Sequence, residues 1–301
     1  MAPPTAQLPA SDFLTGEELD REALLALLDR AEELKRGRAS GEGRDSLAGR
    51  SVALVFEKPS TRTRVSFEVG VAELGATPIV LHAEELQMTR GESVADTGRI
   101  LSGYLHGIVI RSGSDERVRE LAAGASVPVI NGLTPEHHPC QALADLLTLK
   151  ERFGELDGLR LAYVGDGNNM ARSLAILGRI AGVNVVIASP DGYRIEEGPA
   201  ELTGEPRAAA AGADAIYTDV WVSMGDEEEA ARRRRDLTPY QLNDELLDVA
   251  SDRVVALHCL PAHPGEEITA EVLYGERSAV WEQAENRLHA QKALLERLLG
   301  A

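Results

Sequence analysis

Basic residues are scarce in this 301-residue chain, which has 31 Lys and Arg against 49 Asp and Glu and a formal net charge of −18. Charge of that sign repels nucleic acids and anionic membranes, so we expect neither as a partner. The basic residues that matter for function are expected to lie together in a pocket.

Cysteine is nearly absent as well, since the chain has only Cys140 and Cys259, each in a polar segment that contains proline. This usage is unlike a secreted disulfide framework and favours a reducing, cytoplasmic location. No apolar run approaches the roughly 20 residues of a membrane span, and residues 1–12 lack the basic and apolar regions of a signal peptide. We therefore expect neither a membrane span nor a targeting segment.

What the chain does contain is an alternation of apolar, β-rich runs with amphipathic stretches, which is typical of an α/β protein with parallel sheets. A helix is expected first, because Leu24, Leu27, Leu28, Ala31 and Leu34 recur at helical spacing. Strands are expected at residues 51–56, 77–81, 107–110 and 127–130, and then at 159–164, 183–188, 213–218 and 253–257. Cores usually divide at this chain length, so two lobes are expected.

Four further segments complete the predicted organisation. An amphipathic stretch at about residues 140–153 separates the two series of strands and is expected to connect the lobes. Residues 281–299 form another helical pattern, which can pack across either lobe. Residues 192–206 are interpreted as a surface loop, and the four arginines at 232–235, which follow three glutamates, as a solvated face without a binding role.

The segment Ser60-Thr61-Arg62-Thr63-Arg64 follows an expected strand and opens an expected helix. Backbone N–H groups at a helix N-terminus, hydroxyls and guanidinium groups together make the donor set that a phosphate needs. An ordinary helix cap with surface arginines is the alternative. The sequence has no Gly-x-x-x-x-Gly-Lys-Ser/Thr, which argues against a nucleotide P-loop.

Two more candidates stand where expected elements end or begin. Arg111 follows the strand at 107–110 and is expected to point into the crevice where parallel sheets bind ligands. His138 and Gln141 stand at the start of the connecting helix. His138 can donate a hydrogen bond to a carbonyl oxygen, and Gln141 can turn its amide toward the cleft. A histidine at a helix start is, however, more often a cap.

Two polar segments follow strands of the second series. Gly-Asp-Gly-Asn-Asn-Met at residues 165–170 resembles part of a dinucleotide fingerprint, with Asp191 near the place of a ribose-binding acid. Met170 replaces the third glycine of that fingerprint, and the two asparagines suit a small polar substrate at least as well. Asp-Val-Trp-Val-Ser-Met-Gly at residues 219–225 can hold a cationic or zwitterionic ligand, with a plain strand-end turn as the alternative.

The second cysteine lies in His258-Cys259-Leu260-Pro261-Ala262, directly after the last expected strand. A thiol near cationic groups shifts toward the thiolate, which suits nucleophilic or proton-transfer roles, whereas an inert, small apolar residue is the alternative. His258, Cys259 and His263, together with His138 and Cys140, can suggest zinc. They lack the close paired spacing of structural zinc sites, so no metal is expected.

Taken in order, these segments resemble the aspartate/ornithine carbamoyltransferase family. The resemblance rests on Ser-Thr-Arg-Thr (60–63), Gln87 with Arg90, Arg111, His-Pro-x-Gln (138–141), Asp-Gly-Asn-Asn (166–169), Asp-Val-Trp-Val-Ser-Met-Gly (219–225), His-Cys-Leu-Pro-Ala (258–262) and Gln-Ala-Glu-Asn-Arg (283–287). These segments span nearly the whole chain. Ser-Met-Gly and His-Cys-Leu-Pro are similar to the ornithine branch of the family rather than to the aspartate branch.

The resemblance implies two α/β lobes, each a parallel β-sheet flanked by helices, with the C-terminal helix returning to the first lobe. Residues 1–147 with 284–301 would form a carbamoyl-phosphate-binding domain, and residues 148–283 an ornithine-binding domain. Family members assemble as trimers or multiples of trimers with sites at subunit interfaces. Gln87 would then reach into the site of an adjacent subunit.

The resemblance also implies the reaction. The carbamoyl group of carbamoyl phosphate would pass to the δ-amine of L-ornithine, giving L-citrulline and phosphate in arginine metabolism, with no metal and no organic cofactor. Arg62, Arg111, His138 and Cys259 would be catalytic. Those four residues would bind carbamoyl phosphate with Ser60, Thr61, Thr63, Gln87, Gln141, Leu260 and Arg287, and ornithine would be bound by Asn169, Asp219, Ser223 and Met224.

The chain departs from the family pattern in two places, since the stretch at 189–212 is shorter than usual and Arg90 stands where some members carry lysine. Three other functions compete with the one implied. They are a carbamoyltransferase for another amine, such as acetylornithine, putrescine or lysine, a non-catalytic dinucleotide-binding protein, and a zinc-dependent hydrolase.

Overall fold

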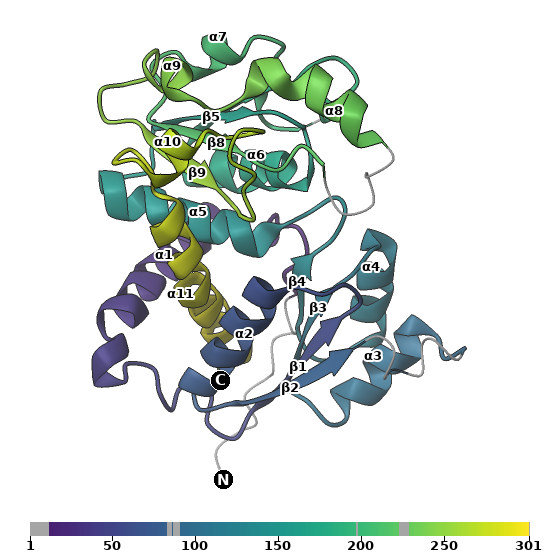
Figure 1. Ribbon diagram of the computed structural model, residues 1–301. Coiled ribbons are helices and arrows are strands. Elements are labelled where there is room, and N and C mark those ends of the chain that lie inside the picture. Colours follow the sequence, from purple (N-terminus) through teal and green to yellow (C-terminus); the bar gives the residue numbers. More distant parts are fainter. Residues whose placement is uncertain (1–11, 83–85, 87–90, 197, 223–228, 301) are drawn as a thin grey trace.

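Two separate parallel β-sheets organise the chain (Figure 1). The computed structural model describes residues 12–82, 86, 91–196, 198–222 and 229–300. The first sheet holds β1 (Ser51–Phe56), β2 (Thr77–His82), β3 (Gly107–Arg111) and β4 (Val129–Leu133) in the order β2-β1-β3-β4. The second holds β5 (Arg160–Val164), β6 (Asn184–Ala188), β7 (Glu201–Thr203), β8 (Ala215–Thr218) and β9 (Val255–His258) in the order β7-β6-β5-β8-β9. The predicted α/β class with two sheets is confirmed.

The structure corrects the prediction in the region of β7. Residues 192–206 were interpreted as a surface loop, but Glu201–Thr203 pairs with β6 in parallel register, with Val186 opposite Glu201. The strand lies at the edge of the sheet and is partly exposed, so it carries no apolar alternation that a sequence pattern can reveal.

The helices cover the sheets on both faces. The longer ones are α1 (Arg21–Arg36), α2 (Thr61–Glu73), α3 (Val94–Ser102), α4 (Asp115–Gly124), α5 (Pro139–Phe153), α6 (Asn169–Ala181), α8 (Ala230–Leu237) and α11 (Val280–Leu299). Shorter ones are α7 (Pro206–Ala210), α9 (Asp244–Leu247) and α10 (Ala270–Tyr274), and 3-10 turns occur at Arg38–Ser40 and Thr238–Tyr240. In Figure 1, α3 and α4 cover one face of the first sheet, and α1, α2 and α11 lie on the other.

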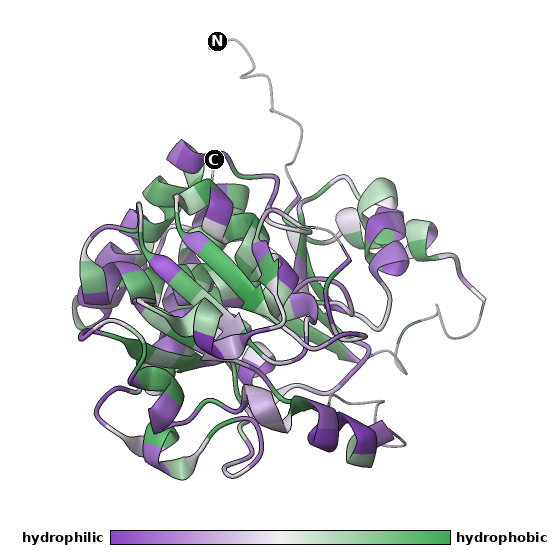
Figure 2. Cartoon of the chain, turned by 90° about the horizontal axis from the view of Figure 1, so that it is seen from above, coloured by the Kyte–Doolittle hydropathy of each residue, from purple (hydrophilic) through white to green (hydrophobic). Residues whose placement is uncertain are grey.

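Strand β1 shows why both faces need cover. Val52, Leu54 and Phe56 point into one hydrophobic cluster, whereas Ala53 and Val55 point into another. A parallel strand that is apolar on both faces must be buried on both, which accounts for its continuous apolar run in the sequence. Figure 2 shows the same pattern, with hydrophobic strands in the interior and hydrophilic residues concentrated in the outer helices and loops.

Helix α5 connects the two lobes, as predicted, and residues 139–149 along it are all buried. A helix that is covered on every side belongs to a core. The cluster around it extends from β1 and α2 of the first lobe to β5 and β8 of the second. Helix α11 packs against α5, α1 and α2, so the C-terminal helix does return to the first lobe.

In each sheet the order of strands reverses at one point, between β1 and β3 in the first sheet and between β5 and β8 in the second. Crevices that bind ligands form at such points, outside the carboxyl ends of the strands. The segments at 60–64 and 165–170 follow β1 and β5, while Arg111 and Asp219 stand at or just after the ends of β3 and β8. The topology therefore places the polar motifs at the two switch points.

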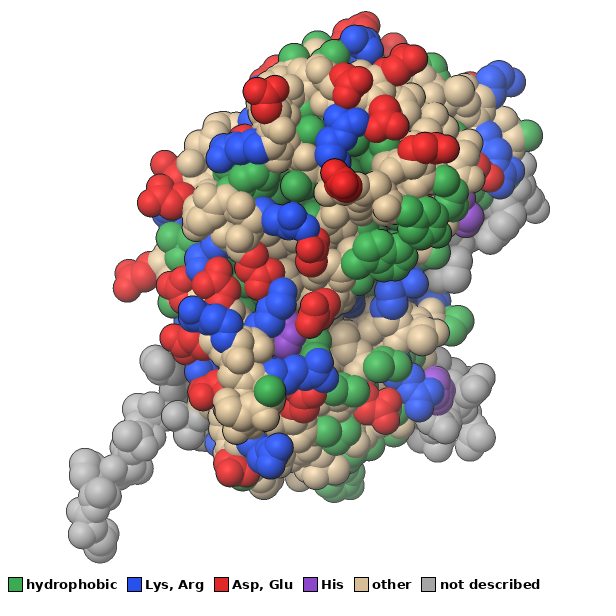
Figure 3. All heavy atoms as spheres, turned by 60° about the vertical axis from the view of Figure 1, so that its left-hand side comes forward, with side chains coloured by type: hydrophobic (Ala, Val, Ile, Leu, Met, Phe, Trp, Pro, Cys, Tyr) green, Lys and Arg blue, Asp and Glu red, His purple; other side chains and the backbone are tan. Residues whose placement is uncertain are grey.

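No helix in the described part of the chain is long and apolar enough to cross a bilayer. On the face shown in Figure 3, Lys and Arg side chains are intermingled with Asp and Glu side chains. That distribution fits the expectation that function resides in a crevice and not on a basic surface.

Candidate active site

The first half of the site is the N-terminus of α2. Ser60 has an extended backbone and caps the helix, since its hydroxyl accepts a hydrogen bond of 3.3 Å from the N–H of Thr63. The first turn contains no acidic residue. The positive end of the helix dipole therefore faces the crevice without a negative side chain to neutralise it, which leaves it suited to an anionic ligand.

Three arginines converge on this helix end. Arg62 Nη2 donates 2.7 Å to the carbonyl oxygen of Leu260, and Arg287 Nη2 donates 3.1 Å to Thr63 Oγ1. Burial, followed by the nearby Arg287 and Arg62, lowers the pKa of Arg111 to about 10. Within the described residues none of the three guanidinium groups forms an ion pair with a carboxylate. Because the positive charges of these three groups are close together, the site favours a ligand that carries more than one negative charge.

His138 completes this half of the site from the start of α5. Its side chain does not cap the helix, contrary to the cap interpretation, and its backbone N–H donates 2.8 Å to Ser173 Oγ. Burial, together with Arg287, Arg111 and Arg62, lowers the imidazole pKa well below its usual value, so the ring is neutral at pH 7.

The contact of His138 with Arg287 assigns the tautomer of this neutral ring. Nε2 lies 3.4 Å from Arg287 Nη1, and a guanidinium can only donate. Nε2 is therefore the acceptor and Nδ1 carries the proton. Among the described residues that Nδ1–H group has no partner although it is buried, so it is available to a ligand oxygen.

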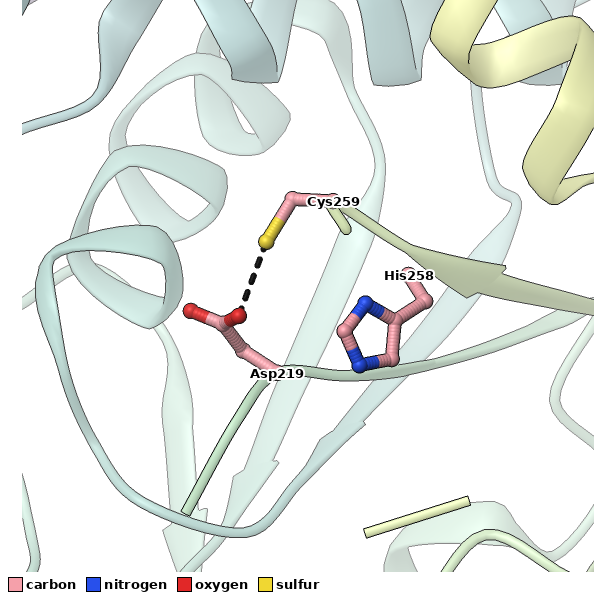
Figure 4. A group of neighbouring side chains, drawn as sticks. All are labelled: Asp219, His258 and Cys259. Carbon is pink, nitrogen blue, oxygen red and sulfur yellow. Dashed lines mark hydrogen bonds between the residues drawn. The ribbon is translucent and has the colours of Figure 1, made fainter. Parts of the chain in front are cut away.

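The second half of the site surrounds Asp219, which is only 7% exposed (Figure 4). Its Oδ1 accepts hydrogen bonds from Cys259 Sγ at 2.9 Å and from the N–H of Val220 at 2.8 Å, and its Oδ2 accepts one from Asn168 Nδ2 at 2.7 Å. No Lys or Arg within the described ranges forms an ion pair with this carboxylate. A largely buried carboxylate held only by neutral donors is suited to receive a cationic group.

The environment of Cys259 contradicts the expected shift toward thiolate. Burial and the adjacent Asp219 raise the thiol pKa well above its ordinary value. The thiol is therefore protonated at neutral pH and donates its hydrogen to Asp219, as Figure 4 shows. The thiol therefore has a polar partner and is not packed only as a small apolar side chain.

Leu260 occupies an unusual backbone position between the two halves, with φ of +60°. Only glycine adopts this region readily, and a branched residue there costs about 1–3 kcal/mol. His258 holds the turn, since its Nδ1 accepts the N–H of Leu260 at 2.9 Å while its Nε2 faces Glu267 at 3.1 Å. The turn thereby directs the Leu260 carbonyl toward Arg62.

One group of side chains in the site has the composition of a possible metal centre. It consists of Asp219, His258 and Cys259, whose potential ligand atoms lie within 4.8 Å of one another. Each donor already has a partner: the thiol hydrogen is given to Asp219, and both nitrogens of His258 face the polypeptide. A zinc ion would require these contacts to break and the raised thiol pKa to be overcome. The arrangement fits a hydrogen-bonded substrate pocket better than a metal centre.

Gly167 has a packing role, which argues against reading residues 165–170 as a dinucleotide site. A Cβ on Gly167 would lie 2.6 Å from the carbonyl oxygen of Tyr193 and 2.7 Å from the nitrogen of Ile195. The N–H of Gly167 donates 2.7 Å to the Tyr193 carbonyl. The segment at 193–195 thus occupies the approach that a pyrophosphate would need.

The run at 232–235 was predicted to be a solvated face, which is wrong for Arg233. Its side chain is 11% exposed, forms an ion pair with Asp166 and donates 2.6 Å from Nε to the carbonyl oxygen of Trp221. Arg233 thereby ties α8 to the turn that carries Asn168. The sequence gives no sign of this contact, because all four arginines of the run look equivalent.

Most of the predicted site residues are brought together. Asn169 Nδ2 donates 2.7 Å to the carbonyl of Thr134 in the first lobe, and Gln141 Oε1 accepts 2.6 Å from Arg287 Nη1. Thr61 lies in the first turn of α2 beside Arg62. Gln87, Arg90, Ser223, Met224 and Gly225 lie outside the described residues.

Comparisons with known proteins cover both lobes. Residues 11–151 match the family model described as aspartate/ornithine carbamoyltransferase, carbamoyl-P binding domain, and residues 157–298 match the corresponding Asp/Orn binding domain. A curated relative from Acidothermus cellulolyticus, named ornithine carbamoyltransferase, is 53% identical over 303 aligned residues that cover 96% of each chain.

Solved structures give the same result. Ornithine carbamoyltransferase from Pyrococcus furiosus superposes with a TM-score of 0.93 at 45% identity, covering 99% of both chains. The enzyme from Thermus thermophilus superposes with a TM-score of 0.89 at 45% identity, covering 97% of this chain and 100% of that one. The chain therefore belongs, over nearly its whole length, to the aspartate/ornithine carbamoyltransferase family.

Proposed function

We propose that this protein is an ornithine carbamoyltransferase, which transfers the carbamoyl group of carbamoyl phosphate to the δ-amine of L-ornithine to give L-citrulline and phosphate. The observation that carries the proposal is a division of charge. Three guanidinium groups that have no carboxylate partner among the described residues lie at the N-terminus of α2, and a carboxylate held by neutral donors forms the other half of the site. Such a site matches a phosphate dianion next to an amino acid with positively charged amines.

The proposed carbamoyl phosphate site lies in the first crevice. Ser60, Thr61, Arg62, Thr63 and the amides of α2 would hold the phosphate, with Arg111 bridging to the carbonyl oxygen. This charge neutralisation stabilises the leaving group as the C–O bond breaks.

Carbonyl polarisation is assigned to His138, Arg111 and Thr63. The protonated Nδ1 of His138 is a donor without another partner in the described structure. Preorganised donors of this kind are each worth about 2.7–4 kcal/mol of barrier. The carbamoyl NH2 group would be oriented by the oxygen of Gln141 and the Leu260 carbonyl, with Arg287 holding the Gln141 amide.

Ornithine is proposed to bind in the second crevice. Asp219 would pair with the α-ammonium group, and Asn169 would contact the α-carboxylate. Ser223 and the backbone of Met224 are assigned to the same substrate on the resemblance alone, as is Gln87 to the phosphate from an adjacent subunit. The δ-amine would arrive beside Cys259.

The protonated thiol limits the role of Cys259. Because its pKa is raised, Cys259 cannot accept a proton at neutral pH, and it would instead orient the δ-amine through its sulfur. The amine loses two protons between –NH3+ and the –NH– group of citrulline. The departing phosphate oxygen is the proposed acceptor of one, and the other passes to solvent.

The division into domains, the assembly and the location in the cell are proposed on the resemblance to the family. Residues 1–147 with 284–301 would bind carbamoyl phosphate and residues 148–283 ornithine. The enzyme would work as a homotrimer, or a multiple of trimers, in the cytoplasm, where its product supplies arginine biosynthesis. The two free thiols, Cys140 and Cys259, are compatible with a reducing compartment.

The test is citrulline formation from carbamoyl phosphate and ornithine, run beside aspartate, acetylornithine, putrescine and lysine, with EDTA present. Turnover on ornithine is expected, and none on acetylornithine or putrescine, because these two lack the free α-ammonium group that Asp219 would receive. Aspartate and lysine carry that group and differ from ornithine in the side chain, so they test whether the amine must be the δ-amine. Turnover on another amine would show that the assignment of the Asp219 pocket to ornithine is wrong, while the phosphate site would stand. Loss of activity in EDTA would contradict the metal-free assignment.

A further inference from the structure

Asp145 is a buried carboxylate to which the reaction described above gives no role. It is 0% exposed and lies on α5 among buried apolar residues, one helical turn after Gln141. Burial raises its pKa to about 7, although hydrogen bonds from Gln141, Gln283 and Tyr217 act in the opposite direction. Burial of a carboxyl group costs free energy unless hydrogen bonds replace those it made to water.

Those contacts are two amide groups on the same oxygen. Asp145 Oδ1 accepts 2.9 Å from Gln141 Nε2 and 2.7 Å from Gln283 Nε2. The nitrogen end of each amide therefore points at the carboxyl group, and the oxygen end points away from it. The first glutamine comes from α5 and the second from α11, so Asp145 joins two helices at the site.

The two oxygens that point away reach opposite halves of the active site. Gln141 Oε1 accepts 2.6 Å from Arg287 Nη1, in the carbamoyl phosphate half. Gln283 Oε1 accepts 2.9 Å from the backbone N–H of His258, at the start of the turn that carries Cys259. Gln283 Nε2 also donates 3.1 Å to the hydroxyl of Tyr217.

We propose that Asp145 is a positioning residue that fixes the orientation of both amides, so that each presents its oxygen, and not its NH2 group, to the active site. The proposal rests on the proposed carbamoyl transfer, because only then does the Gln141 oxygen receive the carbamoyl NH2 group. Asp145 itself touches neither substrate.

The physical reason is the near symmetry of a carboxamide. Its oxygen and nitrogen ends have almost the same shape, so hydrogen-bond partners alone decide which end faces which way. If Gln141 turned over, its NH2 group would face the guanidinium of Arg287, donor against donor. A reversed Gln283 would likewise oppose the N–H of His258. An acceptor at position 145 excludes both reversals at once.

The proposal predicts a difference between two substitutions of similar size. Asp145→Leu removes the acceptor, and we expect kcat to fall by about a hundredfold, the loss that follows when a reacting group is misplaced by about 1 Å. Asp145→Asn keeps a carbonyl oxygen for both amides, so it should recover most of that loss. In both variants inorganic phosphate should still raise the melting temperature as in wild type, because the phosphate donors are intact.

The outcomes separate this inference from the proposed function. If the wild-type enzyme makes citrulline and D145L makes it at the same rate, the positioning role is overturned. The carbamoyltransferase assignment then still stands. Equal losses in D145L and D145N would also overturn it, since charge and not acceptor geometry would then be required. A wild-type enzyme that makes no citrulline would contradict the proposed function itself.

A measurement on the unaltered protein covers the case in which D145L does not fold. Neutron diffraction from crystals of the deuterated enzyme locates the deuterons of both glutamine amides. They are expected on the nitrogens that face Asp145. Deuterons of Gln141 directed at Arg287 would overturn the proposal whatever the variants show.

Discussion

Arg62 and Leu260 join the two halves of the active site, since the guanidinium Nη2 donates 2.7 Å to the carbonyl oxygen across 198 positions of sequence. Arg62 belongs to the first turn of α2 in the first lobe, and Leu260 to the turn after β9 in the second. The positive φ of Leu260 aims its carbonyl at this contact. Two residues of the candidate site are thus in direct contact between the lobes.

Arg62→Ala is expected to reduce kcat/KM for carbamoyl phosphate by about 10²–10³-fold, because a charged donor to the leaving group is lost. The same change breaks the contact with Leu260. Steady-state kinetics with ornithine at saturation measures the loss. Normal activity in this variant would remove the segment at 60–64 from the phosphate site.

Arg64 provides the matched control two residues along the same helix. It forms an exposed ion pair with Glu68 at 3.2 Å. Exposed pairs of this kind contribute little, so Arg64→Ala should change kcat/KM by less than about twofold. A loss as large as that of Arg62→Ala would mean that the helix, and not the guanidinium of Arg62, is what matters.

The reactivity of Cys259 tests its pairing with Asp219. Burial and Asp219 raise the thiol pKa, so the wild-type enzyme should react slowly with iodoacetamide at pH 8. Asp219→Asn removes the negative charge, and the thiol should then be alkylated faster. Mass spectrometry follows the label, and Cys259→Ser, which lacks the thiol, should take up none at this position.

Cys259→Ala separates orientation of the amine from binding of the first substrate. The thiol donates its hydrogen bond to Asp219, in the half of the site proposed for ornithine, so kcat should fall by more than the affinity for carbamoyl phosphate. Kinetics with either substrate varied gives both quantities. Equal turnover in the variant would exclude Cys259 from the reaction.

Arg233 and Arg232 are neighbours in α8, but only the substitution of Arg233 is expected to destabilise the fold. Arg233→Ala breaks the ion pair with Asp166 and the hydrogen bond to Trp221, and should lower the free energy of unfolding by about 1.5–3 kcal/mol. Arg232 is exposed and pairs with Glu229, so Arg232→Ala should leave the unfolding midpoint unchanged. Urea denaturation of both variants measures the difference, and equal midpoints would contradict the structural role of Arg233.

The sequence predicted those features of the fold that depend on residues close together in the chain. The strands of both sheets, apart from β7, carry apolar runs because they are buried, and the motifs after them lie at strand ends because parallel sheets bind ligands there. Ser60 and Arg111 are examples, and both lie in the first crevice. Such residues can be recognised because position along one element determines where they point.

Contacts between distant elements were not predictable in the same way. Arg233 looks like its three neighbours in the run, yet it alone reaches both Asp166 and Trp221. The raised pKa of Cys259 depends on Asp219, which arrives from another strand. Asp145 is visible in the sequence as the single acid within residues 139–149 of α5. Its two glutamine partners become clear only in the folded chain.

The pH dependence of the reaction tests the state of His138. Its pKa is lowered well below 6.5, so the neutral ring with its donor at Nδ1 is present throughout the range from pH 6.5 to 8. The kcat/KM for carbamoyl phosphate should therefore show no histidine titration in this range and should fall only at lower pH. A limb with an apparent pKa near 6.5 would show that the ring charges in the free enzyme.

The same lowered pKa fixes the sign of a stability effect. Below pH 6.5 the unfolded chain binds a proton at this histidine that the folded chain does not, so acidification favours unfolding until the folded pKa is reached. His138→Gln cannot titrate, so its free energy of unfolding should depend less on pH between 6.5 and 5 than that of wild type. Urea denaturation across this range measures both slopes, and identical slopes would contradict a neutral, buried His138.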